Sequence, residues 1–127
     1  ISIITVWVGV QTGAAEEITM VFELAPGSEP VASDAVHWAV ICDDGAGTPG
    51  LIDGDLSTAT ELDGATVAAT FNPGETYMID LIVGGGAGAS CAPALNEEHQ
   101  MVISANGGGS TYETLFYKST TQGDSVV

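Results

Sequence analysis

Basic residues are almost absent from this sequence. Its 127 residues include one, Lys118, against 17 acidic residues, for a formal net charge of -16. Nucleic-acid binding is therefore excluded, because it requires cations that replace the counterions of phosphate, and direct contact with an anionic membrane surface is opposed for the same reason. Because 45% of the residues are hydrophobic and only 14% are charged, the chain is not an acidic disordered tail. We predict one globular domain over residues 1–127.

Long hydrophobic runs are also missing. No stretch approaches the roughly 20 apolar residues that span a bilayer, and no signal-peptide pattern occurs. The chain begins at Ile1 rather than at a methionine. We therefore expect a mature or shortened chain, in which any membrane or assembly segment of the native protein would precede Ile1.

Cysteine and histidine are scarce, which limits the chemistry available. Cys42 and Cys91 lie far apart, without C-x-x-C spacing and without a neighbouring histidine, so a zinc or redox pair is disfavoured. A disulfide between them is preferred over free thiols and indicates an oxidising exterior. The histidines are His37 and His99, and no G-x-S-x-G elbow accompanies them. Nothing supports a specific reaction, and we predict that the chain is not an enzyme.

Helical periodicity is hard to find in this sequence. Instead, short runs rich in β-branched residues are separated by Gly, Pro, Asp and Asn. They predict an all-β fold, an immunoglobulin-like antiparallel β-sandwich of about seven or eight strands; a jelly roll or a small barrel fits the same pattern. We expect Val36, Trp38, Val40 and Cys42 to share one strand face, and a long irregular stretch over Asp43–Leu62. The expected strands lie at 3–10, 18–24, 36–42, 66–71, 77–83, 100–105 and 111–118.

A G-x-G-x-x-G pattern spans Gly45–Gly50. A phosphate-binding loop of this type also needs a helix that begins within the motif. No helix start follows here, and Asp43 and Asp44 would repel a phosphate. The pattern is interpreted as a surface loop.

Oxygen-bearing side chains recur at alternate positions further along. They stand at relative positions 1, 3, 5 and 9 of a loop that begins at Asp53: Asp53, Asp55, Ser57 and Glu61. This spacing is typical of a loop that binds a hard cation, Ca²⁺ or Mg²⁺. The EF-hand glycine and the final bidentate glutamate are missing, since Thr58 and Gly64 stand there. A solvated loop is the alternative to a metal site.

Three stretches in order resemble the outer domain of archaellins, the archaeal flagellins. They share with that family a strand that ends at an A-x-G corner, a strand that ends near a Trp, and a late pair of closing strands. The stretches are residues 18–31 (ITMVFELAPGSEPV) running on through 33–38 (SDAVHW), residues 72–81 (NPGETYMIDL), and residues 95–104 (LNEEHQMVIS) followed by 110–114 (STYET).

The resemblance implies a structural role as the surface-exposed domain of an archaeal motility filament, outside the cell. It also implies an upstream hydrophobic helix, through which the subunit would polymerise with copies of itself or with other archaellins. The family carries no catalytic residues to transfer. Two alternatives remain open: a type IV pilin-like adhesin or accessory archaellum component, and an extracellular module that binds calcium or carbohydrate through the Asp43–Asp63 loop.

Overall fold

The computed structural model describes residues 1–12, 15–43, 49–84, 91–105 and 109–127. Within these ranges the chain forms strands and one short 3₁₀ turn, η1 (Ser33–Ala35), and no α-helix. The strands are β1 (Ser2–Thr12), β2 (Ala15–Glu23), β3 (Val31–Ala32), β4 (Val36–Asp43), β5 (Pro49–Asp55), β6 (Thr60–Glu61), β7 (Thr70–Phe71), β8 (Thr76–Gly84), β9 (Glu98–Ala105) and β10 (Ser110–Phe116).

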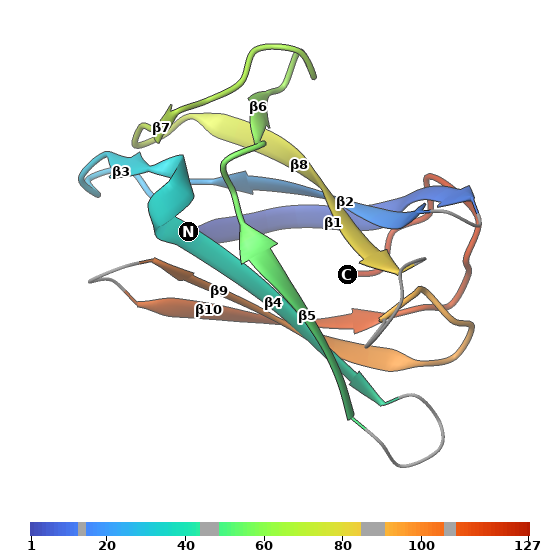
Figure 1. Cartoon of the computed structure of the whole chain (residues 1–127). Helices are drawn as coiled ribbons and strands as arrows, with labels where there is room; N and C mark the ends of the chain where they lie inside the picture. The colour runs from blue at the N-terminus through green and yellow to red at the C-terminus, as the bar shows by residue number, and fades with distance from the viewer. Residues whose placement is uncertain (13–14, 44–48, 85–90, 106–108) are drawn as a thin grey trace.

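Two four-stranded sheets pack face to face (Figure 1). The first has the order β1-β2-β8-β6 and the second the order β10-β9-β4-β5, while β3 and β7 form a small extra pair. Every pair of strands is antiparallel. The immunoglobulin-like β-sandwich predicted from the sequence is confirmed, with eight strands in its two main sheets.

The core lies between the sheets and follows from period-two alternation along each long strand. On β4, the apolar side chains at alternate positions are buried and His37 between them is exposed, as expected. Aromatic rings fill one part of the interior, where Phe22 packs edge-on against Phe71 with ring centroids 5.1 Å apart. The inward residues of the main strands are Val6, Val8, Ile18, Met20, Phe22, Val36, Trp38, Val40, Cys42, Tyr77, Ile79, Leu81, Val83, His99, Met101, Ile103 and Leu115.

The expectation of irregular structure over Asp43–Leu62 was wrong, because two strands lie there. In β5, Leu51 and Ile52 pair with Ile41 and Val40 of the neighbouring strand. Asp and Gly are poor strand formers in general. They are tolerated here because β5 is the last strand of its sheet, where charged side chains protect an edge that no other strand covers.

The strand expected over 66–71 is shorter than predicted. Thr70 and Phe71 pair with β3, and Val67 forms a single antiparallel bridge with Thr60 of β6. Ala65 and Thr66, just before this bridge, belong to a turn that Asp63 stabilises, since its carboxylate accepts hydrogen bonds from their backbone amides. Local side-chain hydrogen bonds of this kind compete with strand pairing.

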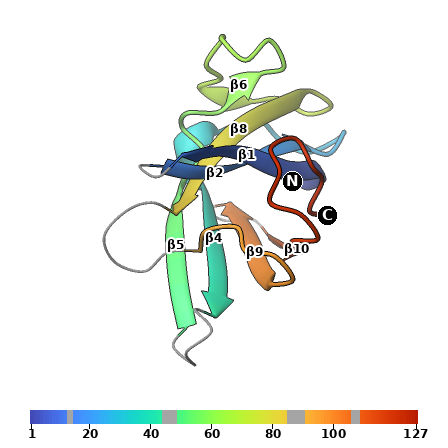
Figure 2. The ribbon, with the colours of Figure 1, turned by 90° about the vertical axis from the view of Figure 1, so that its right-hand side faces the viewer.

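The C-terminal segment joins the two sheets along one side of the sandwich. Its Val126 amide donates to the Val6 carbonyl at 2.9 Å, and the Val126 carbonyl accepts from the Phe116 amide at 3.0 Å. The segment therefore bonds to β1 of the first sheet and to the end of β10 of the second (Figure 2). Val126 is buried, so the segment also contributes to the core.

Candidate functional site

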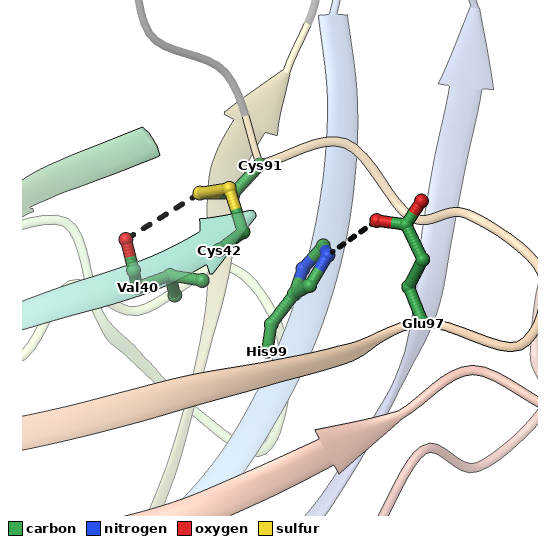
Figure 3. Close-up of a disulfide and its surroundings, with 5 residues drawn as sticks. All are labelled: Val40, Cys42, Cys91, Glu97 and His99. Atoms are coloured by element: carbon green, nitrogen blue, oxygen red, sulfur yellow. Dashed lines mark hydrogen bonds and ion pairs between the residues drawn. A yellow bond between two sulfur atoms is a disulfide. The ribbon is translucent and has the colours of Figure 1, made fainter. Parts of the chain in front are cut away.

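The two cysteines lie together at one end of the sandwich. The structure joins Cys42 and Cys91 by a disulfide, with their Cα atoms 5.6 Å apart. Cys42 belongs to β4 of the second sheet, whereas the amide of Cys91 bonds to the Val83 carbonyl of β8 in the first sheet. The bond therefore links the sheets covalently (Figure 3). Both residues are buried, so this pair is structural.

His99 belongs to the core and not to a reactive site. Its side chain is 1% exposed, and its Nε2 lies 3.3 Å from Glu97 Oε1. The ring packs edge-on against Tyr117, with centroids 5.1 Å apart. Burial raises the pKa of the Tyr117 hydroxyl, because the phenolate would be charged in an apolar surrounding. With so little exposure, the pair offers a substrate no access.

The two histidines are not brought together. His37 faces outward on β4, opposite Ser104 of β9, whereas His99 faces the core further along β9. Among the described contacts, no serine or other nucleophile lies beside either ring. This arrangement gives no support to a Ser-His-Asp triad.

The four residues predicted to hold a cation are spread over two sheets and the turn between them, where Ser57 lies. Asp53 and Asp55 lie on β5 of the second sheet, whereas Glu61 lies on β6 of the first. Asp55 Oδ1 accepts hydrogen bonds from the Ser57 amide at 2.9 Å and from its hydroxyl at 2.5 Å. These bonds favour the ionised form, so the pKa of Asp55 is lowered. The Ser57 hydroxyl is thus hydrogen-bonded to Asp55, which leaves the Ser57 oxygen less available to a metal ion.

No group of three or more His, Cys, Asp and Glu side chains able to hold a metal ion occurs within the described part of the chain. The cation site therefore stays a prediction, with calcium calorimetry as its test. The G-x-G-x-x-G pattern falls largely on residues 44–48, which lie outside the described ranges; its last glycine, Gly50, pairs with Cys42 in the sheet.

A cleft of about 540 Å³ opens at the end of the sandwich where the chain begins. Its walls include Ile1, Leu24, Pro30 and Val31, and Glu29 is the one carboxylate among the described lining residues. A single carboxylate supplies neither a general acid–base pair nor a metal-ligand set. The described lining of the cleft therefore does not support a specific reaction.

The outer face of the second sheet carries an apolar surface that sequence reasoning did not identify. Tyr112 lies beside Val102, Val102 beside Ala39, and Ile41 beside Leu51, each as direct cross-strand neighbours. We call these five residues the apolar strip. The period-two pattern of each strand places them outward, but only the strand order β10-β9-β4-β5 makes them neighbours.

The described residues define a class of fold, an antiparallel β-sandwich whose two sheets are linked by one disulfide. No helix in the described ranges is long and apolar enough to cross a membrane. No protein-family model and no curated protein sequence matches the chain.

Among solved structures, the chain is similar to one described as the archaeal flagellum of Methanospirillum hungatei strain JF1. The TM-score is 0.62 at 15% sequence identity, and the match covers 99% of this chain and 70% of that chain. At this identity the likeness shows that the two share a fold. The archaellin resemblance inferred from the sequence is thereby supported at the level of the fold.

Proposed function

We propose that this chain is the surface-exposed domain of an archaeal filament subunit, of the archaellum type, and that its role is structural. The observation that carries the proposal is the similarity of nearly the whole chain, 99% of its residues, to a chain of an archaeal flagellum. The motif resemblance of residues 18–38, 72–81 and 95–114 to archaellins supports the same role. Two independent comparisons therefore support one role.

The physical character of the domain fits a position outside the cell. A disulfide is stable in an oxidising exterior, and a net charge of -16 favours solubility of the separate domain. The partners are further copies or related subunits, and polymerisation proceeds through a hydrophobic helix that precedes Ile1. The domain itself contacts neither nucleic acid nor the membrane.

Composition of sheared filaments tests the role. Filaments are detached from cells of the source organism, purified, and quantified by mass spectrometry with peptides of this chain as standards. As a major filament subunit, the chain should be among the most abundant proteins of the preparation. A trace amount beside an abundant different subunit would reject this role and favour the accessory component or the adhesin.

A further inference from the structure

Strand β1 is the longest described strand and lies at an edge of the first sheet. Its sequence, SIITVWVGVQT, contains no charged residue and no proline, whereas the other described strands of seven or more residues each contain an acidic residue. At an edge, the outward amides and carbonyls have no partner within the sheet, so the strand is a template for pairing with another chain. Charged side chains, a usual protection of such an edge, are missing from β1.

Irregular pairing interrupts β1 on both sides of its middle. The register of β1 against β2 shifts between Ile3 and Thr5, and it shifts again between Val8 and Gln11. Bulges of this kind twist an edge and hinder the approach of another strand. The regular part between the two shifts, from Thr5 to Val8, has no such protection of its own.

The C-terminal segment covers this regular part of the edge (Figure 2). The residues that do so are Gly123–Val126, which we call the strap. The Val8 amide donates to the Asp124 carbonyl at 2.9 Å, and the Val8 carbonyl accepts from the Gly123 amide at 2.7 Å. The strap therefore occupies both outward polar groups of Val8, in the manner of a further antiparallel strand.

A single apolar side chain anchors the strap. Val126 is 4% exposed and its amide donates to the Val6 carbonyl, whereas the other three residues of the strap are exposed. Ser125 lies opposite Trp7 as its antiparallel partner. An attachment with one buried side chain and few backbone bonds opens at a lower free-energy cost than the domain unfolds, so release of the strap leaves a folded domain with an open edge.

We infer that the strap guards the β1 edge, and that the partner it excludes is the β1 edge of a second copy. Charge favours this partner, because two β1 strands bring together no carboxylate of their own, whereas the other long strands of this acidic chain each carry one. Antiparallel pairing of two identical edges is isologous, so one surface supplies both halves of the contact. The inference goes beyond the filament role and does not depend on it.

Release of the strap within the whole chain tests the guard. Gly123→Pro with Val126→Pro removes the two strap amides that donate to β1, and proline cannot adopt the φ of +95° found at Gly123. Both substitutions keep the net charge. Hydrogen exchange at the Val8 amide reports whether the strap has detached. Val127→Pro is the matched control, because Val127 is exposed and lies just beyond the strap.

Sedimentation in high salt, which screens the charge, measures the association. The original chain and the control should stay monomeric, whereas the released variant should reach at least double the monomer mass as its concentration is raised. Adding Thr5→Lys to the released variant should restore the monomer, because a lysine on an edge strand hinders strand addition. This substitution also makes the chain less acidic, so a general loss of repulsion would act in the opposite direction.

Two results would overturn the inference: a released variant that stays monomeric while its Val8 amide exchanges freely, or association that survives Thr5→Lys. Circular dichroism shows whether each variant is folded. Where the double variant is not folded, the single substitutions Gly123→Pro and Val126→Pro take its place, and association should then rise with the loss of protection at Val8. Association without that loss, or that loss without association, would contradict the guard equally.

Discussion

At the scale of single residues, Gly54 is a position where an added side chain would collide with the core. It pairs with Trp38 across β5 and β4, and a Cβ added at Gly54 would lie 2.9 Å from Trp38 Nε1. The indole is buried in the core and has little room to move. We predict that Gly54→Ala destabilises the fold by about 1–3 kcal/mol, measured by chemical denaturation with tryptophan fluorescence.

Gly109 provides the control for that substitution, since no atom lies within 4 Å of a Cβ added there and its φ is not left-handed. Gly109→Ala should leave the free energy of unfolding nearly unchanged. Equal stability of the two variants would mean that Trp38 does not pack on Gly54 as described.

The stability of the hairpin over residues 59–68 depends on pH through the turn at Asp63. Hydrogen bonds from Thr66 and Ala65 lower the pKa of this carboxyl. A lowered folded-state pKa means that the stabilisation is complete above the unfolded value of about 3.9 and is lost as the pH falls through the folded value. We predict that the hairpin amide signals of Ala65 and Thr66 lose their dispersion on acidification into that range. Asp63→Asn should remove this transition, and a variant that retains it would assign the effect to another group.

At the scale of elements, the disulfide has the largest expected effect on stability. It closes a loop between residues 49 positions apart, and the chain-entropy model gives about 4 kcal/mol for a loop of this size. We predict that the double substitution Cys42→Ala, Cys91→Ala lowers the free energy of unfolding by that order. Chemical denaturation of the variant and of the oxidised original chain checks it, and equal midpoints would contradict the prediction.

The C-terminal segment is the second element with a testable role. Val126 is buried between β1 and the end of β10, whereas its neighbour Val127 is exposed. We predict that Val126→Ala destabilises the domain by about 2 kcal/mol, while Val127→Ala has almost no effect. Thermal unfolding of the two variants compares them directly. Matching melting temperatures would show that the segment is dispensable.

Most of the long strands could be predicted from the sequence. The runs at β1, β2, β4, β8, β9 and β10 were anticipated because each carries enough Val, Ile, Leu or aromatic residues to bury one face. β5 was missed because Asp53, Gly54 and Asp55 are unfavourable for a strand when taken alone. Its pairing with β4 overrides that local preference, and pairing is a tertiary contact.

At the scale of the whole molecule, charge controls association. Seventeen acidic residues against one basic residue leave most carboxylates without a cation. In a filament, neighbouring copies repel unless ions screen them. We predict that assembly of the complete subunit requires high salt or divalent cations. Light scattering during dialysis measures it, and filaments that persist in dilute buffer with a chelator would contradict it.

The sequence by itself determined the fold class, the inward faces of the long strands and the cysteine pair, because each depends on local periodicity or on there being only two cysteines. Only the tertiary structure decided which strands are neighbours. Strand order places Asp53 and Glu61 on different sheets, and it aligns Tyr112, Val102, Ala39, Ile41 and Leu51 into one strip. The physical reason is that hydrophobic burial specifies which face of a strand turns inward, whereas the outward neighbours of a residue depend on pairing between segments distant along the chain.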